Sequence, residues 1–516
     1  MSKKLITTAI PYMNGVPHIG HALEVILTDV IARGYRLLGE EVFFLTGADE
    51  HGSKILKTAE TAGRDVMDML DENVRHFQDM NTALSISNDG YIRTTDKEKH
   101  WPVVQALWMR MYNNIDPETW ERDIYKKTYA GYYCDREERF VTEEELDENK
   151  CLKEGGAPTR WTEDENYFFR LSRYSDTIKE KLMNGEVKIT PEFRQNEMIA
   201  MIGDGLEDVS FSRTKKQLTW GIPVPNDSDH VMYVWCDALT NYLSWSPFFE
   251  EQRAKSKEQN EGIENLFKNW NCELHVIGKD IARFHCLTWI GMLLSGWINL
   301  PKNILVHGFV NDKDGAKMSK SVGNVIDPHA MIAEYGSDTV RLYMTSEVGV
   351  GQDLNFSDER IRSIHNDVLA NNYGNLVNRV ISLWIAHRDK EPTPASLERK
   401  GIGGLKIFST RYLDALKTNN TQWMFAVIQE LLNDANIMLN TTEPWKKQGE
   451  EKSNILIDWI SYVYYITHML SPFIPKATSK VMKAMGIKEG TTLDDPISID
   501  LNTITKPEIL FEKKFS

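Results

Sequence analysis

Cysteine is scarce in this sequence. Only five cysteines occur among 516 residues, and no two of them form a CxxC pair; they are Cys134, Cys151, Cys236, Cys272 and Cys286. Disulfide-stapled secreted domains are rich in cysteine, so this scarcity excludes a disulfide framework and favours a reducing compartment. We therefore expect a cytoplasmic protein.

Long apolar runs are missing as well. No stretch approaches the roughly 18 to 20 consecutive apolar residues that a membrane helix needs. The first residues lead into a strand-like run without the apolar segment of a signal peptide. We expect neither export nor a membrane partner.

Positive charge is not in excess. The chain has 60 Lys and Arg against 75 Asp and Glu, which gives a net charge of −15. Non-specific binding to nucleic acid depends on the neutralisation of phosphates by positive charge. The negative net charge therefore excludes a protein that binds nucleic acid non-specifically. An RNA partner would have to be recognised through local patches and shape.

The order of apolar segments predicts the fold class. Residues 5–10 and 41–46 have strand patterns, and residues 22–38 between them keep helical spacing, which gives a β-α-β opening. Further strands are predicted at 231–235, 273–278 and 303–308, whereas apolar residues recur at helical spacing from about residue 358. We predict an α/β protein: a Rossmann-like parallel-sheet domain, split by an insert and followed by an α-helical bundle.

The predicted domains follow from changes in this pattern. Between residues 116 and 226, charged helices, turns and a Gly155-Gly156-Ala157-Pro158 break indicate an inserted subdomain. The expected order is therefore the first half of the sheet domain (1–115), the insert (116–226), the second half (227–300), a linking region (301–357) and the helical domain (358–516).

A His-x-Gly-His motif lies where the first strand leads into the first helix. His18 and His21 can donate hydrogen bonds to phosphate oxygens at a helix start, where backbone N–H groups also favour anions. Gly20 lacks a side chain, so a nucleotide could lie close to the backbone. The alternative is that the two histidines only cap the helix.

A polar, glycine-containing segment at 312–321 carries a second motif, Lys317-Met318-Ser319-Lys320-Ser321. Its two lysines could reach a triphosphate and stabilise the charge that accumulates on departing pyrophosphate. Taken alone, such a segment is better explained as a solvated charged loop.

Together the two motifs resemble the pair that defines class I aminoacyl-tRNA synthetases. Strings along the whole chain, such as residues 47–52 (GADEHG), 233–238 (YVWCDA) and 306–309 (VHGF), are similar to those of the methionyl-tRNA synthetases. The resemblance implies that ATP, with Mg²⁺, activates methionine to an adenylate, which then esterifies the 3′ end of initiator and elongator tRNA(Met). It implies catalytic roles for His18, His21, Lys317 and Lys320.

The resemblance also implies binding residues. ATP would contact Gly20, Gly278, Asp280 and Lys320, and Asp49 would hold the ammonium group of methionine. The remaining residues implied in methionine binding are Ile10, Tyr12, Trp235, Ala238, Tyr242, Ile281, Phe284 and His285. Aromatic and aliphatic walls suit a thioether, which offers few hydrogen bonds. Leu239 stands where many relatives carry proline.

In the helical region, the resemblance implies an anticodon site. Asn371, Asn375 and Arg379 are spaced for one helix face, and Trp445 follows Glu443-Pro444. Single-stranded bases are recognised by stacking on aromatic rings and by hydrogen bonds at their edges. Without the other motifs, a solvated helix face and a Trp at a helix start would explain these residues.

The sequence departs from the resemblance in the insert. Members of the family often carry a zinc knuckle of CxxC pairs, but here Cys134 is followed by Glu137 and Cys151 by Glu154. Structural zinc strongly prefers Cys and His, so we expect no structural zinc. We also expect no separate editing domain, because the insert is small, and a monomer, because the chain ends soon after the helical region.

Three other functions remain open from the sequence. One is another class I aminoacyl-tRNA synthetase, such as the cysteinyl enzyme, which would need a metal for its substrate thiol; a ligand set for that metal is not evident here. A small-molecule nucleotidylyltransferase can share the His-x-Gly-His site but needs no helical RNA-reading domain. A catalytically silent tRNA-binding protein would not need His18, His21, Lys317 and Lys320.

Overall fold

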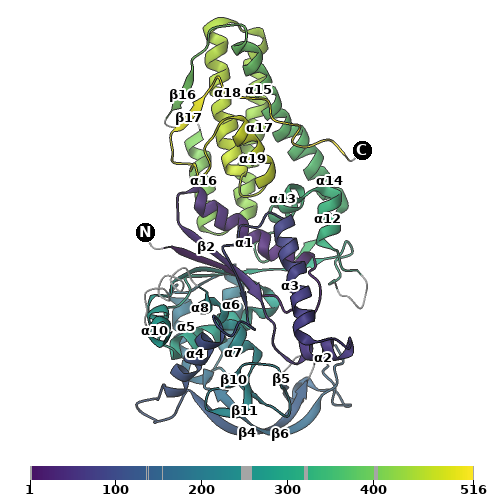
Figure 1. Cartoon of the computed structure of the whole chain (residues 1–516), viewed down its shortest axis with the longest axis vertical. Coiled ribbons are helices and arrows are strands. Elements are labelled where there is room, and N and C mark those ends of the chain that lie inside the picture. Colours follow the sequence, from purple (N-terminus) through teal and green to yellow (C-terminus); the bar gives the residue numbers. More distant parts are fainter. Residues whose placement is uncertain are drawn as a thin grey trace.

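A computed structural model of the chain describes residues 3–134, 136, 139–153, 155–245, 259–318, 324–399 and 405–514. Several residues named above, including Glu137, Glu154, Ser319, Lys320 and Ser321, lie outside these ranges. The molecule is elongated, with a sheet-containing part at one end and a helical part at the other (Figure 1).

The centre of the first part is a parallel sheet, as predicted. Its strand order is β3-β2-β1-β12-β13-β7, and every pairing of neighbouring strands is parallel. The strands are β1 (Lys4–Thr8), β2 (Val42–Ala48), β3 (Gly90–Arg93), β7 (Lys188–Thr190), β12 (Cys272–Gly278) and β13 (Asn303–His307). All six strands therefore end at the same edge of the sheet, where parallel-sheet proteins bind ligands.

Alternate residues of these strands enter different cores. Ile6 and Phe44 belong to one apolar core, while Leu5 and Leu45 belong to the core on the opposite face. The helices of this part are α1 (Ile19–Leu37), α2 (Ser53–Thr61), α3 (Val66–Ala83), α4 (Trp101–Asn113), α5 (Ser175–Met183), α6 (Glu192–Ile202), α10 (Gln259–Asn269) and α11 (Trp289–Ser295). Burial on both faces explains why the strands have continuous apolar runs.

Two small antiparallel sheets are formed by the insert together with the residues that follow it, up to Met232. One has the order β5-β4-β6-β8 and the other the order β10-β11-β9, and long curved strands β4 and β6 form the lower rim in Figure 1. The strands are β4 (Ile124–Cys134), β5 (Arg139–Val141), β6 (Arg160–Phe169), β8 (Val209–Ser210), β9 (Ser212–Thr214), β10 (Pro223–Val224) and β11 (Asp227–Met232).

Two details differ from the sequence prediction. The strand expected at 231–235 is wrong in its second half, because β11 ends at Met232 and the short helices α7 (Val234–Leu239) and α8 (Asn241–Ser244) follow. Within the range 116–226, β7 pairs with β13 in the main parallel sheet. A three-residue edge strand is too short to show a periodic pattern, so it could not be predicted from the sequence.

The second part is helical, as predicted. Its helices are α12 (Pro328–Tyr335), α13 (Ser337–Glu347), α14 (Asp358–Ser363), α15 (Asn375–Arg388), α16 (Lys406–Lys417), α17 (Thr421–Thr442), α18 (Gly449–Leu470) and α19 (Pro475–Ala484), with the π-helical stretch η5 (Ile364–Gly374) and the 3₁₀ turn η7 (Pro444–Lys446). The strand β16 (Ser396–Arg399), which the sequence did not predict, pairs antiparallel with β17 (Ile497–Asp500). The short strands β14 (Val310–Asn311) and β15 (Leu354–Asn355) pair in the linking region.

Helix α1 joins the two parts. It packs on the sheet and also contacts α13, α16 and α17 of the helical part, so most of its residues are buried. Gly34 lies where an added Cβ would come 2.8 Å from Leu416 of α16. None of the helices in the described ranges combines the length and apolarity needed to cross a lipid bilayer.

Candidate active site

The two motif histidines form the start of helix α1. The backbone N–H of Gly20 donates to His18 Nδ1 at 3.1 Å, and the N–H of His18 donates to His21 Nδ1 at 3.1 Å. Their rings stack with centroids 3.7 Å apart. The two histidines therefore do cap the helix, which was the alternative to a role in phosphate binding. This capping has a chemical consequence.

That consequence concerns the position of the ring protons. Because Nδ1 of each imidazole accepts a backbone hydrogen bond, the proton of a neutral ring must lie on Nε2. Each neutral ring therefore donates hydrogen bonds through its Nε2–H group. Gly20 permits this arrangement, since an added Cβ would lie 3.0 Å from Cε1 of His18. The same helix start provides a positive dipole end.

Glu24, half-buried and one turn further along α1, pairs with the buried His307 of strand β13. His307 Nε2 is 2.9 Å from Glu24 Oε2, and His307 Nδ1 donates to the carbonyl of Gly308 at 2.7 Å. Burial raises the pKa of Glu24. Burial opposes protonation of His307, but the bond to Glu24 outweighs it and leaves the pKa of His307 raised. The pair therefore holds a proton more tightly than either group would alone.

Gly278 and Asp280, two of the residues predicted to contact ATP, lie beside this pair. Gly278 ends strand β12, and an added Cβ there would come 2.8 Å from Asp280 Oδ1 and 3.7 Å from Cε1 of His307. The charge of Asp280 also raises the pKa of Glu24. Gly278, Asp280, Glu24 and His307 thus form one polar group at the carboxyl edge of the sheet.

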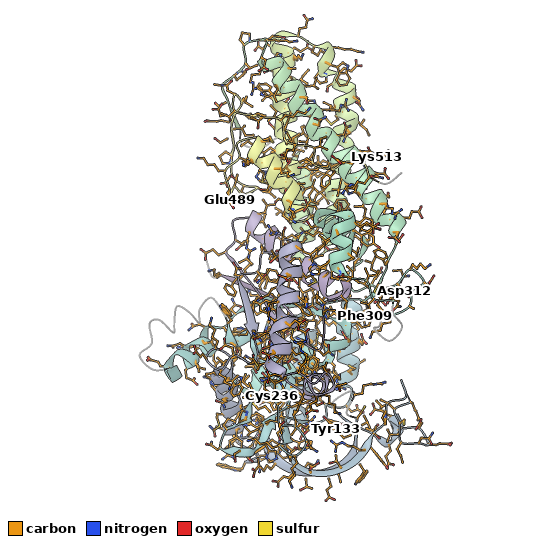
Figure 2. The ribbon with its side chains drawn as sticks, turned by 45° about the vertical axis from the view of Figure 1, so that its right-hand side comes forward. Tyr133, Cys236, Phe309, Asp312, Glu489 and Lys513 are labelled. Carbon is orange, nitrogen blue, oxygen red and sulfur yellow. The ribbon has the colours of Figure 1, made fainter. Side chains whose placement is uncertain are left out.

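The first residue of the second motif, Lys317, lies near the same edge. Figure 2 shows Phe309 and Asp312 on one side of the molecule, close to each other. The ammonium groups of Lys317 and Lys279 both lie 4.4 Å from the ring centroid of Phe309. Lys279 also contacts Asp353 at 2.8 Å. Lys317 is therefore placed, whereas Ser319, Lys320 and Ser321 fall outside the described residues.

Aromatic side chains gather on the other side of strand β12. Trp235 of α7 and Phe284 stack almost parallel, with ring centroids 3.9 Å apart and an angle of 6°. Both are half-buried, as are Ile10, Tyr12 and Ile281, and all five pack against the same apolar core. The structure thus brings together the residues that the sequence predicted as a side-chain pocket.

His285 has a fixed and neutral form in this pocket. Its Nδ1 donates to the carbonyl of Ile281 at 3.1 Å, so Nε2 accepts from the hydroxyl of Tyr242 at 2.7 Å. Burial lowers the pKa of His285 to about 4. Burial also raises the pKa of the Tyr242 hydroxyl well above its ordinary value. Neither group carries charge near neutral pH, which suits an uncharged ligand side chain.

Asp49 lies between the two halves of the site. Its backbone N–H donates to Pro11 and its carbonyl accepts from the N–H of Met13, both at 2.9 Å, so it pairs with the chain around Tyr12. The side chain is 8% exposed. Ala238, also predicted in this pocket, is 4% exposed. Gly47 allows the close approach of two residues: an added Cβ would lie 2.3 Å from the carbonyl oxygen of Ile92 and 3.0 Å from Cγ2 of Ile10.

The predicted anticodon residues are at the far end of the molecule. The guanidinium carbon of Arg379 lies 5.4 Å from the ring centroid of Trp445, and Arg379 donates to Asn440 Oδ1 at 2.9 Å. Trp445 is 42% exposed. Asn371 and Asn375 are exposed on η5 and α15. Arg379 and Trp445 are thus brought together by two helices distant in sequence.

The cysteines of the insert have different surroundings. Cys134 is fully buried in a small apolar cluster with Val141, Leu146, Leu152 and Ala157, and Cys151 is half-buried. All five cysteines are free thiols. Among the described residues there is no group of three or more His, Cys, Asp or Glu that could hold a metal ion. Glu137 and Glu154 are not among those residues, so the absence of zinc stays a prediction.

Sequence reasoning gave no role to several polar residues of this region. Glu24 lies three residues after His21 on α1, a spacing that could have placed it on the same helix face. His307 was noted only within a string, as was Asp237. His51 was likewise noted only within a string, and His100 was not noted at all, because the contacts of both with Asp237 are made in the tertiary structure.

Comparisons with known proteins agree with this geometry. The family described as tRNA synthetases class I (M) matches residues 4–152 and 141–381. A methionine–tRNA ligase of Brucella suis is 38% identical over 94% of this chain and 92% of its own length. That of Rickettsia prowazekii is 36% identical over 98% of both chains. The crystal structure of Mycobacterium tuberculosis methionyl-tRNA synthetase bound by methionyl-adenylate superposes with a TM-score of 0.85 at 35% identity, over 99% of this chain and 100% of that one. The chain therefore belongs to the methionyl-tRNA synthetase family of class I aminoacyl-tRNA synthetases.

Proposed function

We propose that this protein is a methionine–tRNA ligase. In the first step the carboxylate of methionine attacks the α-phosphate of ATP, which forms methionyl-adenylate and releases pyrophosphate. In the second step the methionyl group passes to the 3′ end of tRNA(Met), initiator and elongator, and AMP leaves. One observation carries the proposal: the paired histidines of α1 and an uncharged aromatic pocket lie at the same edge of the sheet. The family membership supports it.

The histidines act on the α-phosphate. His18 and His21 present Nε2–H donors to the oxygens on which charge grows in the transition state, at the positive end of the α1 dipole. Gly20 leaves room for the nucleotide, and Gly278 and Asp280 bind its ribose. Lys317 and Lys320 neutralise the departing pyrophosphate, and Mg²⁺ accompanies ATP.

The pocket selects the amino acid. Asp49 binds the ammonium group, and the side chain lies among Ile10, Tyr12, Trp235, Ala238, Tyr242, Ile281, Phe284 and His285. A neutral His285, fixed by Ile281 and Tyr242, leaves no unpaired charge beside the thioether. In the helical part, Asn371, Asn375, Arg379 and Trp445 read the anticodon.

Several further features belong to the same proposal. The domains are those given above, with β7 returning to the catalytic sheet. The insert folds without structural zinc, since Cys134 lies in an apolar cluster. The free thiols fit a reducing compartment, so we place the enzyme in the cytoplasm. A monomer is predicted, which sedimentation analysis checks.

ATP–pyrophosphate exchange across the standard amino acids tests the activity. Methionine should stimulate exchange and cysteine should not, because the pocket is apolar and the described residues include no group of three or more His, Cys, Asp or Glu that could hold a metal for a substrate thiol. Charging of initiator and elongator tRNA(Met) should follow. Exchange stimulated by cysteine alone would show that a cysteinyl activity is correct instead.

A further inference from the structure

A buried carboxylate lies between two histidines behind the aromatic pocket. Asp237 Oδ2 is 2.5 Å from His51 Nδ1, and Asp237 Oδ1 is 2.6 Å from His100 Nε2. Asp237 is 1% exposed, His51 2% and His100 0%. None of the three has a role in the proposed chemistry. We call them the His51–Asp237–His100 cluster.

The carboxylate of this cluster is ionised. Burial opposes ionisation, but the charges and hydrogen bonds of the two histidines outweigh it and lower the pKa of Asp237. An ionised carboxylate only accepts hydrogen bonds, so both ring nitrogens that face it carry a hydrogen. A buried carboxylate is costly unless its oxygens are fully paired, and here each oxygen has its own imidazole.

The cluster connects three separate segments. His51 lies in the turn after β2, two residues beyond Asp49. His100 immediately precedes α4 and also contacts the hydroxyl of Ser244 through Nδ1 at 2.7 Å. Asp237 belongs to α7. One carboxylate therefore fixes the turn that carries the ammonium-binding group relative to the helix that carries the aromatic wall.

The geometry of α7 places Asp237 behind this wall. In an α-helix, Trp235 and Ala238 are three residues apart and share a face, while Asp237 points to the opposite side. Helix α7 has only six residues, too few to be stable without anchoring contacts. The bonds of Asp237 to the two histidines supply such an anchor.

The turn that holds His51 is itself firmly placed. The indole N–H of Trp220 donates to the carbonyl of Glu50 at 2.7 Å, and the ring of His51 packs edge-on against Trp220 with centroids 5.6 Å apart. The backbone of Asp49 is bonded to Pro11 and Met13 on the other side. A change at Asp237 would therefore move α7 rather than the Asp49 turn.

We propose that Asp237 is a positioning residue that sets the separation between the ammonium-binding Asp49 and the aromatic wall of α7, and thereby the length of side chain that the site accepts. This inference rests on the proposed function. Its effect should appear in the recognition of the amino acid and not in that of ATP, whose predicted contacts lie on α1, at the end of β12 and after it.

The test is methionine-dependent ATP–pyrophosphate exchange by Asp237→Asn. The amide cannot accept from both imidazoles, so one contact is lost. We expect the KM for methionine to rise about tenfold or more, the loss typical of a hydrogen bond to a charged group. The KM for ATP should stay within about twofold of its value in the unchanged protein, and the preference in kcat/KM for methionine over the longer ethionine should fall by about fivefold or more.

Conservative variants separate positioning from folding. His51→Asn keeps an N–H where Nδ1 stood and should retain most of the methionine affinity, whereas His51→Leu should resemble Asp237→Asn. If Asp237→Asn does not fold, the comparison of these two His51 variants tests whether the cluster positions the amino-acid site. Asp79→Asn, an exposed change on α3, is the matched control and should leave every parameter unchanged.

Two results would overturn the inference. One is a folded Asp237→Asn protein with unchanged methionine KM and unchanged ethionine discrimination. The other is a uniform fall in kcat for both amino acids with all KM values unchanged, which a merely structural role would give. If the unchanged protein shows no methionine-dependent exchange, the proposed function fails, which is a separate outcome.

Discussion

Arg341 and Asp29 form an ion pair from which solvent is fully excluded. Nη2 of Arg341 lies 2.7 Å from Oδ2 of Asp29, and neither side chain is exposed. The other donors of Arg341 reach the carbonyls of Leu84, Pro472 and Phe473. Asp29 is in α1, the helix that begins with the motif histidines, so one guanidinium ties this helix to the helical part of the molecule.

The first prediction concerns this pair. Arg341→Met should lower the free energy of unfolding by about 3 to 5 kcal/mol, because it leaves the carboxylate of Asp29 buried without its main partner. Urea unfolding followed by tryptophan fluorescence measures the change. Arg33→Gln is the matched control, since Arg33 bonds the same carboxylate at 2.8 Å from a partly exposed position and should cost less than about 1 kcal/mol. Equal losses in the two variants would contradict the prediction.

The second prediction separates capping from catalysis at His18. The side chain of Asn is among the best helix N-caps, so His18→Asn should keep the bond to Gly20 and the thermal midpoint. It lacks the Nε2–H donor, so adenylation should slow by a factor on the order of 10² to 10³. His21→Ala should slow it by a similar factor. A His18→Asn enzyme with unchanged exchange rate would show that His18 only caps the helix.

The third prediction concerns Trp445. Trp445→Ala should spare methionine-dependent exchange and reduce kcat/KM for charging of tRNA(Met) by about tenfold or more, the loss typical of one base-stacking contact. Trp423→Ala is a close control, because Trp423 is 41% exposed in the same part of the molecule, near the opposite end of α17. It should leave charging unchanged. Similar losses in both variants would count against an anticodon role for Trp445.

The fourth prediction is a pH dependence that arises from His285. Its ordinary pKa of 6.5 is lowered to about 4 by burial. The unfolded chain therefore binds a proton near pH 6.5 that the folded protein excludes. The contribution of His285 to stability is full above pH 6.5 and is lost as pH falls toward 4, at about 1.4 kcal/mol for each unit of lowered pKa.

His285→Gln isolates this contribution. His275, whose pKa is also lowered by burial, has the same sign, whereas the raised pKa of His307 has the opposite sign. The difference in unfolding free energy between the unchanged protein and His285→Gln should therefore shrink as pH falls from 6.5 to 4. A difference that stays constant over this range would show that His285 does not titrate as stated.

The fifth prediction concerns metal. Elemental analysis should find less than about 0.1 zinc per chain, and prolonged treatment with a strong chelator should leave the thermal midpoint unchanged, because a structural zinc would contribute directly to folding. Cys134 lies instead in the apolar cluster with Val141, Leu146 and Leu152. One tightly bound zinc per chain would overturn the prediction.

Apolar periodicity and local motifs were sufficient to predict much of the fold of this protein. The parallel sheet follows from short continuous apolar runs and the helical part from helical apolar spacing, and the helix start at His18 follows from a motif with its own local geometry. These features depend on neighbours within a few residues, which the sequence displays directly. The helix at 234–239 was missed because Val234 and Trp235 continue an apolar run that also suits a strand.

Other features depend on residues that are far apart in the chain. The bond of Asp237 to His51 and His100, the pair of Glu24 and His307, and the stack of Trp235 on Phe284 join segments separated by tens to hundreds of residues. Whether a buried carboxylate is ionised, or a histidine neutral, depends on such partners and on the exclusion of water. The sequence by itself determined the fold class and the motifs, and only the tertiary structure decided which polar groups meet and which protons they hold.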